Sequence, residues 1–209
     1  MKTIRTGLQL LAEFRRSYLS INLLYFGLVA CGMFAAMINR DFQHTFLDRG
    51  KAEEFLPKVA AAYDGGHLLA AISLTFIVNL VLGTCAYITG PSLIIPFSGL
   101  LTGSFRAVVW GFIFSPSIAD LDGIHLARGG MIAVLIFLEG QGYVLAMLAT
   151  YVQGKAFLFP TSSGASGRWK GYRMGLQRTV QLYPLVALQL AIAAIYEATV
   201  VIVIKPLLS

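Results

Sequence analysis

Long apolar runs separated by short polar segments dominate the pattern of hydrophobic and polar positions along the chain. Each run approaches the roughly 20 apolar residues that an α-helix needs to cross the hydrocarbon core of a bilayer. We therefore expect an all-α, polytopic membrane helix bundle that forms a single membrane domain over residues 1–209. Five transmembrane helices are predicted, at residues 20–38, 67–88, 93–114, 130–151 and 181–204.

The segment before the first run, residues 2–18, has an amphipathic pattern. Its basic residues fall largely outside one helical face, which is typical of a helix lying in the membrane interface. We predict an N-terminal amphipathic interfacial helix over residues 2–18, with a frayed cytoplasmic tail as the alternative. The apolar face consists of Ile4, Leu8, Leu11 and Tyr18.

The distribution of lysine and arginine determines the orientation that we expect. Residues 2–18 and 152–180 are both rich in basic residues, and residues 152–180 contain no acidic residue. Because basic connections remain in the cytoplasm, we predict the N-terminus inside, a basic cytoplasmic loop at residues 152–180, and the C-terminus outside. Residues 39–66 mix both charges and form the predicted outer loop. Within it, residues 51–63 predict a short helix that caps the bundle or docks a partner.

The composition supports a membrane location. Hydrophobic residues make up 57% of the chain and charged residues 12%, with a mean hydropathy of +0.73, whereas soluble domains carry about twice that charged fraction. The formal net charge of +6 follows from the cytoplasmic lysines and arginines. We predict a multi-pass protein of the cell membrane, such as a bacterial or archaeal inner membrane. Its partners there are anionic lipid headgroups on the cytoplasmic side, without nucleic acid.

Three ionisable residues interrupt the predicted spans: Arg106, Glu139 and Glu197. Such a group costs roughly 2.5 kcal/mol or more at the centre of a bilayer unless it has a partner. Counted along antiparallel helices, Arg106 and Glu139 lie at the same depth, with Glu197 slightly shallower and with Asn79 and Gln141 somewhat deeper. We predict that these five residues form an intramembrane polar cluster, in which Arg106 pairs with Glu139 or Glu197. The cluster either locks helices together or serves transport or gating.

Small residues occur where helices must approach closely. Gly99 and Gly103 have the GxxxG spacing that brings two transmembrane helices together, and Gly140 and Gly142 flank Gln141. We predict that these four glycines are helix-packing positions.

The basic loop interleaves basic and aromatic side chains. Beside a membrane, this mixture is typical of interfacial anchoring and of contact with anionic lipids. We predict that the segment contacts lipid headgroups, with a cytoplasmic partner as the alternative. The residues are Arg168, Trp169, Lys170, Tyr172 and Arg173.

Motifs for catalysis, cofactors and metals are missing from the sequence. There is no HExxH zinc motif and no nucleotide-binding P-loop. The three histidines, His44, His67 and His125, are scattered near the predicted outer face. We therefore expect a protein without catalytic residues, cofactor or metal site.

Three segments between residues 79 and 154 resemble the motifs of one family. They are Asn79 followed after an apolar run by Gly90, then SGLLTG at Ser98–Gly103, then LEGQGYVLA at Leu138–Ala146. They resemble the asparagine-rich second-span motif, the NGxxxG motif and the PHGxxExxA motif of the stage II sporulation protein M family. Gly140 and Ala146 match the third motif, whereas Ser98 replaces asparagine, Glu139 replaces histidine and Tyr143 replaces glutamate.

The resemblance implies five spans after an N-terminal helix, in a non-enzymatic bundle that works through partners. In spore-forming bacteria, members of the family are membrane scaffolds that anchor cell-wall hydrolases during engulfment. Two functions remain open for this chain. The first is an integral membrane scaffold or accessory subunit of a larger complex. The alternative is a permease-like subunit of an ABC-type lipid or small-molecule transporter that uses the arginine–glutamate cluster. Both predict other membrane protein subunits as partners.

Overall fold

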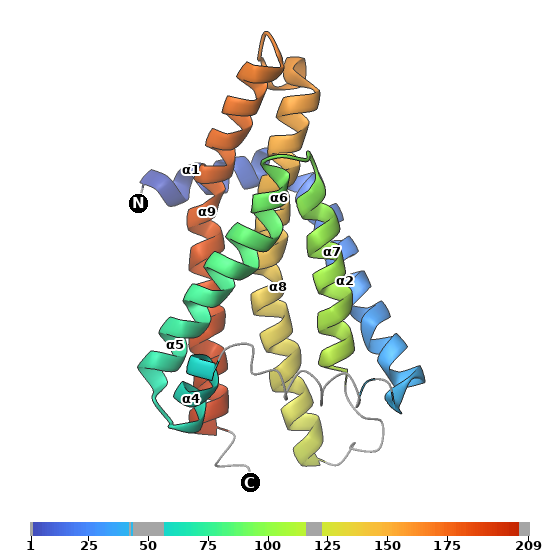
Figure 1. Ribbon diagram of the computed structural model, residues 1–209, viewed down its shortest axis with the longest axis vertical. Coiled ribbons are helices and arrows are strands. Elements are labelled where there is room, and N and C mark those ends of the chain that lie inside the picture. Colours follow the sequence, from blue (N-terminus) through green and yellow to red (C-terminus); the bar gives the residue numbers. More distant parts are fainter. Residues whose placement is uncertain (1, 42, 44–56, 116–122, 205–209) are drawn as a thin grey trace.

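The computed structural model describes residues 2–41, 43, 57–115 and 123–204, and these residues form helices joined by short connections, without a strand (Figure 1). The helices, in chain order, are α1 (Lys2–Glu13), α2 (Arg15–Ile38), α4 (Pro57–Asp64), α5 (Leu68–Ile77), the π-helix η1 (Val78–Thr89), α6 (Gly90–Ser92), α7 (Ser98–Ile113), α8 (Gly123–Leu158), the 3₁₀-helix η2 (Pro160–Ser163), α9 (Arg168–Thr199) and the π-helix η3 (Val200–Ile204).

Four helices are long and apolar enough to cross a membrane: Arg15–Ile38, Leu68–Ser92, Gly129–Leu158 and Arg168–Ile204. The predicted all-helical class is confirmed, and these four helices are consistent with a multi-pass membrane protein. α7 has 16 residues, or about 24 Å, and runs beside α2 and α8 (Figure 1). It is shorter than the predicted run at residues 93–114, because residues 93–97 form turns around Pro96.

The N-terminal segment bends earlier than the pattern indicates. α1 ends at Glu13, and residues 15–18 of the predicted interfacial helix belong to α2. α1 crosses the bundle at a steep angle to α8 and α9 (Figure 1). It packs closely on α9, since a Cβ added to Gly7 would lie 3.0 Å from the Gln181 carbonyl oxygen.

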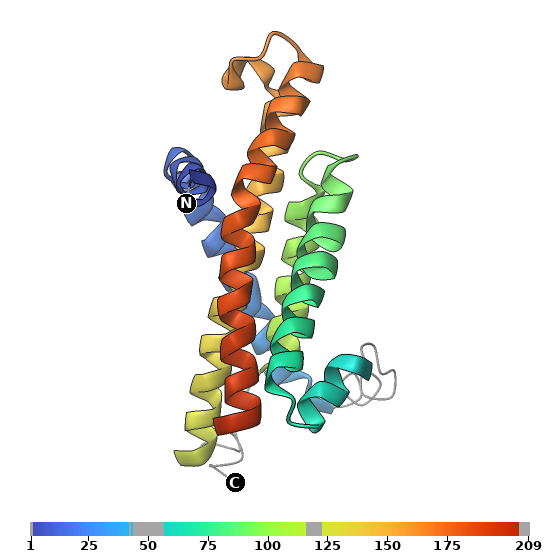
Figure 2. The same cartoon turned by 90° about the vertical axis from the view of Figure 1, so that its left-hand side faces the viewer.

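A helical hairpin takes the place of the loop predicted at residues 152–180. α8 continues to Leu158 and α9 begins at Arg168, so this hairpin extends beyond the other helices at one end of the molecule (Figure 2). The reason for the difference is physical. Hydropathy marks where a helix leaves the hydrocarbon core, and a helix can continue past that point with polar residues.

The predicted outer loop is described only in part. Its second half contains α4, which covers residues 57–63 of the helix expected at residues 51–63 and continues to Asp64. Residues 44–56, including His44, lie outside the described residues, as does the side chain of His125.

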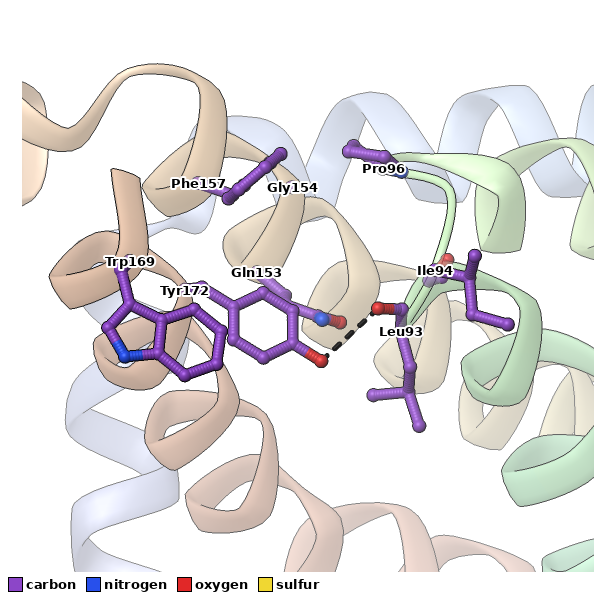
Figure 3. A pocket seen from close by; sticks show the side chains of 9 residues that line it. Leu93, Ile94, Pro96, Gln153, Gly154, Phe157, Trp169 and Tyr172 are labelled. Carbon is purple, nitrogen blue, oxygen red and sulfur yellow. Dashed lines mark hydrogen bonds between the residues drawn. The ribbon is translucent and has the colours of Figure 1, made fainter. Parts of the chain in front are cut away.

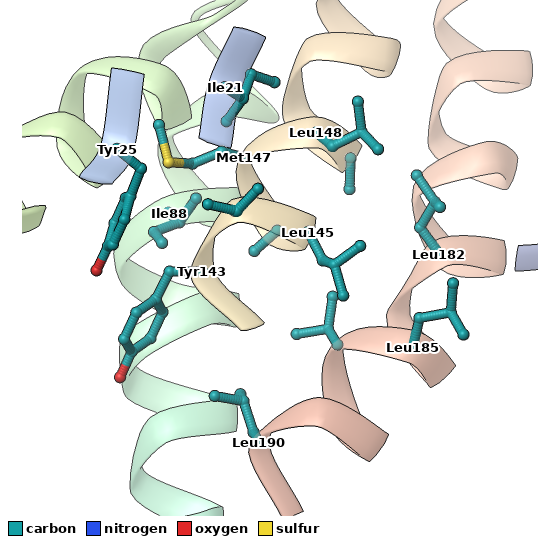
Figure 4. Packing of buried hydrophobic residues seen from close by; sticks show 14 of the residues in the cluster. Ile21, Tyr25, Ile88, Tyr143, Leu145, Met147, Leu148, Leu182, Leu185 and Leu190 are labelled. Atoms are coloured by element: carbon teal, nitrogen blue, oxygen red, sulfur yellow. The ribbon is translucent and has the colours of Figure 1, made fainter. Parts of the chain in front are cut away.

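α8 lies at the centre of the bundle, in contact with α2, α7, η1 and α9. Its side chains from Tyr143 to Ala149 are all buried, and they meet side chains of α2, η1 and α9 in one apolar core (Figure 4). Two glycines set the closest approach around this core. A Cβ on Gly32 would lie 2.1 Å from the Val108 carbonyl oxygen, and one on Gly111 would lie 2.0 Å from the Val29 carbonyl oxygen. The crossing of α2 and α7 therefore depends on both glycines.

We predict that Gly111→Ala separates α2 from α7 and lowers the free energy of unfolding by about 1–3 kcal/mol, the usual cost of overpacking. The measurement is the thermal unfolding midpoint in detergent. Gly27→Ala is the matched control, because a Cβ at Gly27 in α2 meets nothing within 4 Å. Equal midpoints for the two variants would contradict the role of the crossing.

Candidate functional site

Four polar side chains from three elements form a hydrogen-bonded chain inside the bundle. The Arg106 Nη2 of α7 donates to the Tyr143 hydroxyl of α8 at 2.6 Å. That hydroxyl donates to the Asn79 Oδ1 of η1 at 2.9 Å, and the Asn79 Nδ2 donates to the Glu139 Oε1 of α8. We call this set, Arg106, Tyr143, Asn79 and Glu139, the polar chain.

The polar chain connects the arginine to the glutamate indirectly. Within the described part of the chain, no carboxylate oxygen lies within 4.0 Å of the Arg106 guanidinium, whereas Arg178 and Glu13 do form an ion pair at 3.4 Å. Arg106 thus pairs directly with neither Glu139 nor Glu197, the two predicted partners, and it is connected to Glu139 through a phenol and an amide.

Aromatic rings surround the Arg106 guanidinium. Its Cζ lies 4.1 Å from the centroid of Tyr143 and 4.9 Å from that of Trp110. Such cation–π contacts are strongest where water is excluded. They partly replace the hydration that the arginine loses, although its Nε remains buried without a hydrogen-bond partner.

Glu139 is the most buried acidic or basic residue of the described structure, with only 1% of its surface exposed. Its Oε1 accepts from Asn79, but its buried Oε2 has no hydrogen-bond partner. Tyr25 of α2 lies beside the polar chain, with its ring centroid 6.4 Å from that of Tyr143. The carboxyl group therefore has one unused acceptor in an apolar surrounding.

Local sequence explains how these groups meet. Glu139 and Tyr143 are four residues apart, so they share one face of α8. Across from them, Gly83 of η1 leaves room for the phenol, since a Cβ there would lie 3.3 Å from the Tyr143 ring. Asn79 stands near the start of the π-helix, a conformation that is often found at functional sites.

The other two predicted members of the cluster lie elsewhere. Gln141 belongs to the interface of α2 and α8, where its Oε1 accepts from the Tyr18 hydroxyl at 2.5 Å and its Nε2 donates to Asn22 at 2.6 Å. Glu197 is half-buried on α9 and lies near Tyr63 of α4, whose hydroxyl forms a hydrogen bond with Thr75 at 3.0 Å. Burial, together with the Glu197 carboxyl, raises the pKa of Tyr63 to about 12.

Sequence reasoning missed Tyr143 as a member of the site. Tyrosine counts as apolar in a hydropathy pattern, although its hydroxyl needs a partner when it is buried. The available signal was its position one helical turn after Glu139.

The four predicted packing glycines each lie against another element. The Cβ positions of Gly99 and Gly103 on α7 would come within 2.7 Å of Thr150 and 2.5 Å of Met147. Those of Gly140 and Gly142 on α8 would come within 2.9 Å of Phe26 and 2.6 Å of Leu190. These glycines let α7, α2 and α9 approach α8 closely.

The basic and aromatic segment lies at the start of α9. Trp169 and Tyr172 stack with centroids 5.6 Å apart, Arg173 lies 5.2 Å from the Trp169 ring, and Tyr172 donates to the Leu93 carbonyl at 3.1 Å. Both rings line a pocket of about 310 Å³ with the buried Gln153 beside them (Figure 3). Arg168 and Lys170 are exposed on the same turns.

An open groove of about 650 Å³ lies between η1 and α7. Arg106, Asn79 and Trp110 line it together with the small residues Gly83 and Ala86. Two large side chains that line the groove, Leu82 and Tyr87, are exposed. One end of the polar chain thus faces outward, beside the apolar exterior of the bundle.

No protein-family model, curated protein or solved structure matches the chain.

We predict that Tyr143→Phe destabilises the fold, because removal of the hydroxyl leaves the Arg106 Nη2 without its acceptor and the Asn79 Oδ1 without its donor. The expected loss is about 1–3 kcal/mol of unfolding free energy, measured as a lower thermal midpoint in detergent. Tyr151→Phe is the control, since the Tyr151 hydroxyl makes no hydrogen bond to any described residue. If both variants melt together, the polar chain does not hold the helices.

Proposed function

We propose that the protein is a non-enzymatic integral membrane scaffold, or an accessory subunit of a larger membrane complex. In this proposal the groove between η1 and α7 holds one transmembrane helix of a partner, and Arg106 pairs with an acidic side chain on that helix. The resemblance to the stage II sporulation protein M family supports the same kind of role.

A single observation carries the proposal. Arg106 lines an open groove, and the described chain offers it no carboxylate within 4.0 Å. A cation inside a membrane is stabilised by an opposite charge. The groove therefore has both the shape and the charge to hold a helix that carries aspartate or glutamate.

Depth favours a helix over a lipid as the occupant. Arg106 is eight residues from Ser98 and seven from Ile113, near the middle of α7, and thus about 11–12 Å from either end. A phospholipid headgroup stays at the membrane surface, whereas a carboxylate on a transmembrane helix sits at any depth. Gly83 and Ala86 on the groove wall suit close contact between helices.

The proposed topology has five spans, in which α7 with the preceding turn completes the span that its length alone leaves short. α1 lies in the cytoplasmic interface, and the hairpin between α8 and α9 extends into the cytoplasm. The basic residues of α1 and the acid-free composition of residues 152–180 support this orientation.

The alternative, a permease-like subunit, is favoured by one observation: the buried Glu139 Oε2 has no partner. A transport path needs such a group to take up and release a proton or a cargo. The two functions make different demands on Glu139.

We predict that a photo-crosslinking residue at Ala86, inside the groove, forms a covalent adduct with a transmembrane segment that carries aspartate or glutamate. Mass spectrometry of the crosslinked peptide identifies that segment. The adduct should disappear with Arg106→Gln, and the same crosslinker at the exposed Leu101 of α7 should not form it. Adducts with lipid alone, or adducts unaffected by Arg106→Gln, would rule out helix docking.

We also predict that Glu139→Gln preserves function in a deletion strain, because the glutamine oxygen still accepts from Asn79 and assembly does not need a negative charge. The measurements are complementation of the deletion strain and recovery of the crosslinked partner. Lost complementation with unchanged partner recovery would favour the permease.

A further inference from the structure

A second pocket, of about 510 Å³, lies where α1 turns into α2. Its walls come from the end of α1, the first turn of α2, the end of α8, the 3₁₀-helix η2 and α9. We call it the elbow pocket. It is separate from the polar chain and from the aromatic segment at Trp169.

The elbow pocket concentrates positive charge. Four of its lining residues are basic, namely Arg15, Arg16, Lys155 and Arg178, whereas Glu13 is the acidic one. Glu13 pairs with Arg178 at 3.4 Å. The other three basic side chains have no acidic counterpart among the residues that line the pocket.

Phe14 holds two of these cations in place. The Lys155 Nζ lies 5.6 Å and the Arg178 Cζ 5.7 Å from the centroid of its ring, which is 9% exposed. Lys155 comes from α8 and Arg178 from α9, so the buried ring gathers charges from two helices at one point. Such a preformed group of lysine and arginine suits a phosphate, which accepts several charge-assisted hydrogen bonds.

The surroundings of the pocket indicate the source of the phosphate. α1 crosses the bundle with Ile4 and Leu8 exposed, as a helix in the membrane interface does. Leu19 and Leu23 are exposed on α2, and their spacing of four and eight residues from Arg15 places them on the same helical face. An apolar stripe thus leads away from the cationic pocket along α2. A soluble phosphate ester has no apolar part that could contact this stripe, whereas the acyl chains of a lipid can pack against it.

We propose that the elbow pocket binds the phosphate of an anionic phospholipid headgroup, with the acyl chains along Leu19 and Leu23. Lys155 and Arg178 contact the phosphate from the bundle side, and Arg15 and Arg16 contact it from α2. This site is independent of the helix-docking groove and tightens the link between α1 and the α8–α9 hairpin.

The test is native mass spectrometry of the delipidated protein titrated with phosphatidylglycerol, and separately with phosphatidylcholine that has the same acyl chains. We expect phosphatidylglycerol to bind more tightly. The double variant Arg16→Gln/Lys155→Gln should weaken its binding by about thirtyfold, which corresponds to two basic contacts at a membrane surface.

The matched control is Arg5→Gln/Lys58→Gln, which removes two exposed basic residues outside both the pocket and the segment predicted to contact lipid headgroups, and it should leave the affinity unchanged. Lys155→Arg should retain binding, which separates lost charge from lost folding. Equal loss in both double variants would overturn the site, and so would equal affinity for the two lipids. Displacement of the lipid by free glycerol 3-phosphate at equal concentration would reassign the pocket to soluble phosphate esters.

Discussion

The structure depends on a hydrogen-bonded connection between Arg106 and Glu139 inside a mostly apolar bundle. Each charge alone is costly at that depth, and their connection through Tyr143 and Asn79 requires α7, α8 and η1 to hold fixed positions. A slip of one residue in any of these elements breaks the series. Much of the packing around α8 can be understood as the means of keeping this register.

Glycines allow the helices to pack closely where they cross. In a membrane, helices gain little from hiding apolar surface from one another, so close backbone contact contributes much of the attraction. The contact of Gly32 and Gly111 with the facing backbones brings α2 against α7. α7 also packs closely on α8, because Gly103 leaves room for the side chain of Met147. Arg106, one turn further along α7, reaches Tyr143 as a consequence.

The sequence predicted the all-helical class, because the length and hydropathy of the apolar runs determine it. It could not predict the hairpin of α8 and α9, since polar helix beyond the hydrocarbon core has the composition of a loop. The prediction also placed Gln141 and Glu139 in one cluster, although their side chains face different helices. Two positions along a helix differ by about 200° in direction, so Gln141 faces α2 while Glu139 faces η1. The direction of each side chain around the helix, rather than its depth, determines which residues form hydrogen bonds with one another.

The two cationic sites, Arg106 in the η1–α7 groove and the elbow pocket, differ chiefly in their position along the bundle. That position determines which negatively charged group can pair with each. Arg106 lies near the middle of α7, and if α7 spans the membrane as proposed, a phosphate reaches Arg106 only by drawing its headgroup into the hydrocarbon. The cations of the elbow pocket lie beside α1, which the proposed topology places in the membrane interface, where the phosphates of a bilayer are concentrated. The same guanidinium chemistry therefore favours a protein carboxylate at one position and a lipid phosphate at the other. In the proposed scaffold the two sites have separate roles: the η1–α7 groove would hold a partner helix, and lipid at the elbow pocket would link α1 to the α8–α9 hairpin.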